Sequence, residues 1–263
     1  MPGRVAHEEA VADAIFALRN HFGEDGDTFV VSDLVVRHVE GDLRRSLAPD
    51  VMVIRGMQLR EMGSYRVSQE GTVPGFVLEV LSKGTYVANG ARKRTAYARM
   101  GVQEYFRYDP LGQTMAREHG GRRLIGERLV DGVYRELPIG PRGTIRSEVL
   151  GLDVRVRHQE REPGWRELRF RDPKTGDDLP TRQEGRRQQI AAIRLARVSK
   201  EERRRAERKT RTETEARLRA VQQSREHNAA RLRAVQKLED RDEEIQRAKE
   251  RITELEDRLS RRN

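Results

Sequence analysis

The chain has 263 residues, which allows one large domain or one ordinary domain with an appendage. With 35% hydrophobic and 37% charged residues it is too polar for one compact globule of that length, so part of the chain must lack a core. The absence of cysteine excludes disulfides and thiolate metal sites and fits a reducing compartment. No apolar run approaches the roughly 18 residues that cross a membrane, so we expect a soluble, cytoplasmic protein without membrane contacts.

The positive charge is concentrated in the C-terminal part of the chain. Residues 181–263 carry 25 Lys and Arg against 16 Asp and Glu, whereas residues 1–180 carry 28 against 27. The C-terminal segment has no Pro or Trp, and its single Gly is Gly185. This composition is typical of a long solvated helix, so we divide the chain into a body, residues 1–180, and a charged helical tail, residues 181–263.

The body is predicted to be an α/β (α+β) domain. Residues 7–21 place apolar side chains three and four positions apart, which predicts an amphipathic helix. A second helix is predicted over residues 85–100 and a further strand over residues 104–110, so the order is α-β-β-β-α-β. Beyond residue 111, short stretches separated by Gly-rich turns predict an antiparallel meander. The three strands between the helices are predicted from apolar or β-branched runs bounded by Gly, Pro or Asp, at residues 28–39, 50–56 and 75–82.

The tail has the heptad spacing of a coiled coil from about residue 216. Its seam consists of Leu238, Ile245, Ile252 and Leu259, with Ala248 and Leu255 three residues after two of them. An offset upstream register predicts a stammer or two separate coils, and comprises Leu218, Val221, Leu232 and Val235. Over residues 201–215 the seam fades, which predicts a lone polar helix or a disordered stretch.

We therefore expect the tail to make the protein a homo-oligomer through this coiled coil. The alternative is that the arginines of the tail bind nucleic acid directly. Alternating Glu and Arg neutralise one another locally, which favours oligomerisation.

Two carboxylates and one lysine stand in unexpected positions in the body. Glu79 lies mid-strand among apolar residues, so a buried carboxylate there needs a metal, a Lys or hydrogen bonds as partner. Asp50 opens the preceding strand after Pro49, where Asp is also a common turn residue. Lys93 shares an apolar helix stripe with Tyr97, so we expect it to point inward. The set predicts either a plain internal ion pair or a catalytic triad in which two carboxylates hold a divalent cation.

These residues carry a family resemblance. Pro49-Asp50, Glu79-Val80-Leu81-Ser82, and Lys93 with the later run AYARMGVQEYFRYDP resemble the Uma-two family of restriction-endonuclease-like proteins, a branch of the PD-(D/E)XK nucleases. The resemblance extends from about Val5 to Pro180. It implies a restriction-endonuclease-like core with the α-β-β-β-α-β order, which agrees with the order read from the residues.

The resemblance also implies roles for particular residues. Asp50 and Glu79 resemble the two metal-binding carboxylates of the family, which implies Mg²⁺ or Mn²⁺ as cofactor. The signature places its Lys two residues after Glu79, where this chain has Leu81. Lys93 on the following helix is then selected as the catalytic Lys, with Lys83 at the strand end as its rival.

Three further positions bear on activity. Asn89 stands where members of the family usually carry Asp, one turn before Lys93. Glu8 and Glu9 on the first helix are alternative sources of another acidic group. The six His lack the spacing of a helical zinc pair, and a Gly-rich phosphate loop is missing, so zinc and P-loop chemistry are disfavoured.

The sequence therefore predicts a magnesium- or manganese-dependent endonuclease that acts on DNA, with Asp50, Glu79 and Lys93 as catalytic residues. The alternative is a nuclease-like binding or scaffold protein without catalytic activity that assembles through its tail. Asn89 and the nearly neutral body favour this alternative, because a nuclease usually presents positive surface to phosphate.

Overall fold

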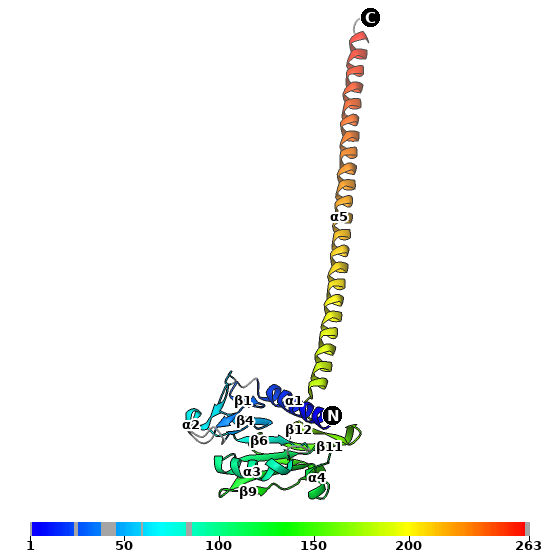
Figure 1. Ribbon diagram of the computed structural model, residues 1–263. Helices are drawn as coiled ribbons and strands as arrows, with labels where there is room; N and C mark the ends of the chain where they lie inside the picture. The colour runs from blue at the N-terminus through cyan, green and yellow to red at the C-terminus, as the bar shows by residue number, and fades with distance from the viewer. Residues whose placement is uncertain (1, 24–25, 38–45, 59, 83–85, 261–263) are drawn as a thin grey trace. The chain divides into compact units, whose positions relative to one another are not determined.

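The computed structural model of the protein describes residues 2–23, 26–37, 46–58, 60–82 and 86–260. The chain divides into two compact units, Met1–Gln189 and Ile190–Asn263. In its described part the protein is mixed α/β, with a central mixed sheet, two smaller sheets and a long C-terminal helix, α5 (Figure 1). Within those same residues, no helix is long and apolar enough to span a membrane.

A six-stranded central sheet organises the body. Neighbouring strands in it are antiparallel except β6 and β7, which are parallel. Helix α3 (Tyr86–Met100) joins this parallel pair, since a parallel crossover needs a long connection. In spatial order the strands are β1 (Thr28–Val31), β4 (Val51–Arg55), β6 (Phe76–Val80), β7 (Glu104–Tyr108), β8 (Leu124–Val130) and β9 (Val133–Glu136).

Both faces of the central sheet are covered, which explains why its inner strands are apolar on both sides. On one face, helix α1 (Pro2–Phe22) packs through Leu18 into a core that contains Phe76 and Leu78 of β6. A second sheet contributes to that core and consists of β10 (Ile145–Ser147), β11 (Leu152–Glu162) and β12 (Trp165–Arg171).

The opposite face has its own core. Tyr97 of α3 is buried there with Val77 of β6 and Tyr105 of β7. A small sheet contributes to this core and consists of β2 (Val36–Arg37), β3 (Ser46–Leu47) and β5 (Tyr65–Arg66). The remaining short elements are α2 (Val67–Glu70), α4 (Met115–Glu118) and a 3₁₀ turn at Pro141–Gly143.

The main elements follow the predicted order α1, β1, β4, β6, α3 and β7. The single strand predicted over residues 28–39 is wrong in its described part, because β1 and β2 belong to different sheets. Asp33 between them has a φ of 52°, a left-handed conformation that turns the chain out of the central sheet. The predicted meander is also divided, since β8 and β9 extend the central sheet whereas β11 pairs with β10 and β12.

Helix α5 (Arg182–Ser260) is continuous through residues 201–215, so the helical alternative is correct there and the disordered one is wrong. This stretch has three ion pairs between residues four apart: Arg203 with Glu207, Lys209 with Glu213 and Arg211 with Glu215. Pairs of this kind stabilise an exposed helix by a few tenths of a kcal/mol each. They add modest support to the helix in a stretch that lacks an apolar seam.

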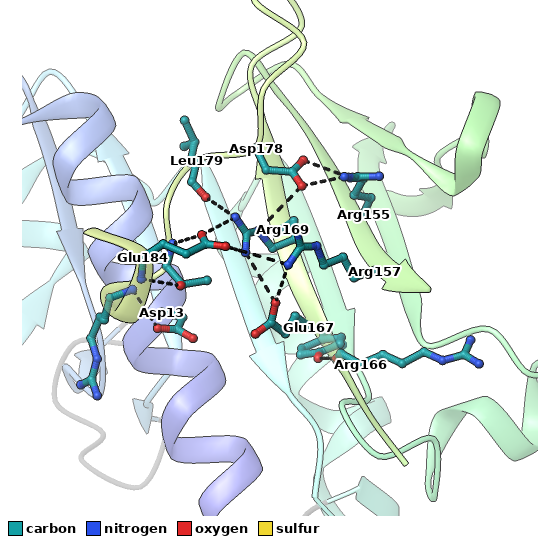
Figure 2. A network of polar contacts seen from close by, with 12 residues as sticks. Asp13, Arg155, Arg157, Arg166, Glu167, Arg169, Asp178, Leu179 and Glu184 are labelled. Atoms are coloured by element: carbon teal, nitrogen blue, oxygen red, sulfur yellow. Dashed lines mark hydrogen bonds and ion pairs between the residues drawn. The ribbon is translucent and has the colours of Figure 1, made fainter. Parts of the chain in front are cut away.

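A polar network fixes the start of α5 within the body unit (Figure 2). The Arg169 side chain on β12 is 3% exposed and donates to both carboxylate oxygens of Glu184, at 3.1 and 2.7 Å. It also donates to the Leu179 carbonyl oxygen at 3.0 Å. Asp178 accepts two hydrogen bonds from Arg155 of β11, at 3.1 and 2.6 Å. Strands β11 and β12 of the second sheet thereby hold the segment from Asp178 to Glu184, which leads into α5.

The first turn of α5 is a capping box. The Thr181 backbone N–H donates to the Glu184 carboxylate at 2.9 Å, and the Glu184 N–H donates to the Thr181 hydroxyl at 3.3 Å. The Arg182 N–H donates to Asp13 of α1 at 3.1 Å. Burial by itself raises the pKa of Glu184, but the Arg169 guanidinium and the Thr181 N–H outweigh it and lower the pKa to about 2.

We expect Glu184→Gln to destabilise the body by about 1–2 kcal/mol at neutral pH, a figure reduced because the carboxylate is about one third exposed. Because the folded-state pKa lies below the ordinary value of 4.5, the contribution of Glu184 is present above that pH and is lost as pH falls through about 2. Urea unfolding at neutral and acidic pH measures both effects. Glu202→Gln, on the exposed surface of α5, is the control. A wild type and a Glu184→Gln variant of equal stability at neutral pH would contradict this account.

Candidate active site

Glu79 is a buried carboxylate in the middle of the central sheet. It lies on β6, whose five residues are all buried, and alternation along the strand directs it with Val77 to the face covered by α3. Two side chains of α3 contact it. The Tyr97 hydroxyl donates to Oε1 at 2.7 Å, and Lys93 Nζ donates to Oε2 at 2.7 Å. The residue is only 5% exposed, so these bonds replace the water that the carboxylate loses.

Lys93 and Tyr97 reach the same carboxylate because residues four apart on a helix share a face. Lys93 points inward as its helix position predicts, and its Nζ also donates to the Ala48 carbonyl oxygen at 3.2 Å. Tyr97, interpreted from sequence as core packing, is fully buried and also orients Glu79.

Asp50 lies beside Glu79 because of the strand register. In the antiparallel pair of β4 and β6, Val51 is opposite Leu78. Asp50 precedes Val51 and Glu79 follows Leu78, so these two residues are opposite one another. The Val80 backbone N–H donates to Asp50 Oδ2 at 2.7 Å. His7 of α1 places Nε2 3.2 Å from Asp50 Oδ1. His7 and Asp50, which are separated by 43 positions in the chain, are therefore neighbours in the fold.

The electrostatics of the site follow from burial and from the two neighbouring carboxylates. Burial and, after it, the charge of Asp50 raise the pKa of Glu79, and the opposing effects of Lys93 and Tyr97 leave it at about 7. The hydrogen bond to Asp50 raises the pKa of His7, although burial opposes it. Burial and the charge of Glu79 raise the pKa of Tyr97, so its hydroxyl stays a donor. Near neutral pH, Glu79 is therefore poised between its two protonation states.

The structure brings together Asp50, Glu79 and Lys93, and their metal-binding and catalytic roles stay predictions. Lys83 lies outside the described residues, and so does the side chain of Asn89. Of the alternative acids, Glu8 is exposed and pairs with Arg4 at 2.7 Å, and Glu9 is half-buried on the same helix.

Sequence reasoning missed His7. It comes from the first helix, and no motif or spacing in the sequence links it to Asp50. Only the packing of α1 against the central sheet brings the two side chains together.

A cavity of about 670 Å³ adjoins the site on the α1 side. His7, which contacts Asp50, is among the residues that line it. Arg19 and Arg182 supply positive charge to the lining, and Glu8 and Asp33 supply negative charge. A ligand in this cavity would contact His7, and through it the Asp50 carboxylate.

The two carboxylates fit a hard divalent cation. In the described part of the chain, no group of three or more His, Cys, Asp or Glu is arranged to hold a metal. Mg²⁺ is nevertheless commonly held by one or two carboxylates, with water and substrate phosphate completing its ligands. Asp50 and Glu79 supply that number of oxygen donors. Burial first and the charge of Asp50 second raise the pKa of Glu79, and a cation would offset both effects.

Comparison with protein-family profiles matches residues 1–157 to the family described as "Uma2: Putative restriction endonuclease". The matched region contains Asp50, Glu79 and Lys93. Among solved structures the chain is similar to a "putative nuclease belonging to DUF820" from Anabaena variabilis ATCC 29413. The identity is 14% over 55% of this chain and 73% of that one, with a TM-score of 0.40. A search of curated proteins finds no significant match.

We expect the stabilising contribution of Glu79 to the body to be lost as pH rises. Its folded-state pKa of about 7 lies above the ordinary value of 4.5, so the folded state holds the proton more tightly than the unfolded state does. The stabilising contribution is complete below pH 4.5 and is lost as pH rises through about 7. Across that range the wild type should lose up to ~3 kcal/mol relative to Glu79→Gln.

Urea unfolding at a series of pH values measures this difference. Glu61→Gln is a suitable control because Glu61 is exposed, and it should follow the wild-type pH profile. Wild-type and Glu79→Gln stabilities that run parallel from pH 4.5 to about 7 would show that the carboxylate is not perturbed.

Proposed function

Because the chain belongs to the Uma2 family, described as a "putative restriction endonuclease" family, we propose that it is a metal-dependent endonuclease that hydrolyses phosphodiester bonds in DNA. The observation that carries the proposal is the contact of Lys93 with the buried carboxylate of Glu79, beside Asp50. A charged group buried away from water is expensive, so such a set favours a functional role over a purely structural one. The order α1, β1, β4, β6, α3, β7 agrees with the core that the sequence resemblance implies.

Asp50 and Glu79 are the residues that would hold Mg²⁺ or Mn²⁺. When bound, such a cation supplies Lewis acidity, which polarises a phosphate and lowers the pKa of water. The protein's own contribution is to fix the two carboxylates. Tyr97 and Lys93 orient Glu79, whereas His7 and the Val80 N–H orient Asp50.

Lys93 is suited to act on the reacting groups. An ammonium group has three N–H donors, of which Glu79 and the Ala48 carbonyl oxygen accept two. The side chain is 24% exposed, so its third donor is accessible to a water or a phosphate oxygen. In this proposal Lys93 positions the attacking water and offsets the negative charge that develops on the phosphate.

The adjoining cavity supports a path for the DNA backbone. It is lined by His7 at the Asp50 end, and Arg19 and Arg182 provide cationic groups for phosphate oxygens. A phosphodiester seated there would contact His7, which in turn contacts Asp50.

The second candidate function is a binding or scaffold role without catalysis. Two points favour it: residues 1–180 carry nearly balanced charge, and Asn89 stands where the family resemblance implies an Asp. In this case the contact between Glu79 and Lys93 would be an internal ion pair that only stabilises the fold.

Incubation of the full chain with plasmid and with single-stranded DNA, in Mg²⁺ or Mn²⁺, separates the two candidates. We expect cleavage by the wild type and a loss of roughly 100-fold or more in Asp50→Asn and in Lys93→Met, because each removes a group that acts on the transition state. Matched controls are Asp27→Asn and Arg92→Met, both at exposed positions of the body. Absence of cleavage by the wild type on either DNA form, with either metal, would favour the scaffold function. Equal cleavage by wild type and Asp50→Asn would reject this site.

Metal should also stabilise the body. A cation that binds only the folded state raises the free energy of unfolding by mass action, by about 2.7 kcal/mol at a hundredfold excess over its Kd. Thermal unfolding of the full chain with and without Mg²⁺ measures this. We expect the shift in wild type, a much smaller one in Glu79→Gln, and an undiminished one in the exposed control Glu61→Gln. An equal shift in wild type and Glu79→Gln would place the metal elsewhere.

A further inference from the structure

Helix α5 carries an exposed apolar stripe in its C-terminal half. Its eight residues are each at least 45% exposed in the single chain. Large apolar side chains aligned along one helix face mark an interaction surface, although Arg225, Asn228 and Arg241 interrupt this row. The stripe consists of Leu218, Val221, Leu232, Val235, Leu238, Ile245, Ile252 and Leu255.

The spacing of the stripe is that of a two-stranded coiled coil. From Leu238 onward, Ile245 and Ile252 occupy heptad position a, and position d is occupied in turn by Arg241, Ala248 and Leu255. Isoleucine at a with leucine at d favours two strands over three or four. The best-matched occupant of this surface is therefore a second copy of the same helix.

Charges beside the stripe specify the orientation of the second copy. In a parallel pair, each position g lies near position e of the next heptad on the partner. Lys237 is then near the partner's Asp242, and Glu244 is near the partner's Lys249. Both contacts join opposite charges and occur twice by symmetry.

The positions away from the seam behave differently. Glu243 and Arg247, at the outer positions f and c, pair with one another within a single helix at 2.9 Å. The charges at the flanking positions e and g thus pair with opposite charges on the other copy. The charges at the outer positions c and f pair within each helix. This division is what a helix built for pairing requires.

An antiparallel pair is the main structural competitor. The stripe is nearly symmetric about the midpoint between residues 236 and 237, so an antiparallel copy could place Leu218 opposite Leu255. That arrangement puts Asn228 opposite Ile245, which buries an amide against an apolar side chain without a partner. It also separates the oppositely charged residues beside the seam, Lys237 from Asp242 and Glu244 from Lys249, that a parallel pair brings together. A parallel pair instead places each apolar residue of the stripe against its own copy.

We propose that α5 binds α5 of a second copy in parallel and in register through this stripe. Since each α5 continues from its own body at Arg182, parallel pairing brings both bodies to the same end of the coil. Resting on the proposed nuclease function, this arrangement supplies two active sites to one DNA duplex, one for each strand. The tail then determines whether cleavage yields double-strand breaks or single nicks.

Disulfide cross-linking tests the orientation, because the chain contains no cysteine of its own. Ile245→Cys should form a disulfide-linked species of twice the 30.4 kDa chain mass under mild oxidation, since the two copies of position 245 face one another. Arg247→Cys, at the outer position c, should cross-link poorly and is the matched control. Cross-linking only in the double variant Asn228→Cys/Ile245→Cys would overturn the parallel orientation in favour of the antiparallel one.

Light scattering on the unmodified full chain tests the number of strands. We expect a dimer in the wild type and a monomer in Ile245→Asp/Ile252→Asp, with the melting of the body unchanged. A monomeric wild type, a trimer, or a double variant that stays dimeric would each overturn the proposal.

Plasmid cleavage by the same double variant separates this inference from the proposed function. If both are correct, the wild type produces linear plasmid early, and the monomeric variant accumulates nicked circles first. If the wild type dimerises and cross-links at position 245 but cleaves no DNA, then the nuclease function fails while the parallel pairing stands. Linear product at the same rate from monomeric variant and wild type would overturn the claim that pairing supplies the second site.

Discussion

The body is organised around one buried carboxylate. Glu79 occupies a strand position that otherwise belongs to the apolar core, and its removal from water is compensated by Lys93 and Tyr97. The compensation is incomplete, because burial and the neighbouring Asp50 still raise the pKa of Glu79 to about 7. A site under such electrostatic strain is expected where a cation or a reacting group is to be bound.

The central sheet and one helix on each of its faces position that carboxylate and its neighbour Asp50. The parallel pairing of β6 and β7 requires a helical crossover, and this crossover is α3, which carries both partners of Glu79. The antiparallel pairing of β4 with β6 brings Asp50 opposite Glu79. From the other face α1 adds His7, which contacts Asp50. The geometry therefore depends on the central sheet and on a helix from each side.

The start of α5 is tied to the same scaffold. The Arg182 N–H donates to Asp13 of α1, two turns from His7 on the same helix. Gly185 lies against Phe16, where a Cβ atom would come within 2.5 Å of the ring, so this one Gly of the tail permits close packing of α5 on α1. The helix that we propose to pair with a second copy thus begins on the element that completes the site.

The sequence by itself determined much of this protein. Local periodicity identified α1, α3 and the central strands, and the heptads of the tail predicted a helix. It also singled out Glu79 and Lys93, because a carboxylate in an apolar strand and a lysine on an apolar helix stripe conflict with their surroundings. Asp50 was identified through the family resemblance of Pro49-Asp50. Only the tertiary structure decided which sheet each strand joins, because pairing is set by long-range packing and by the turn at Asp33. It alone brought His7 to Asp50, since a contact between distant helix and strand leaves no periodic trace in the chain.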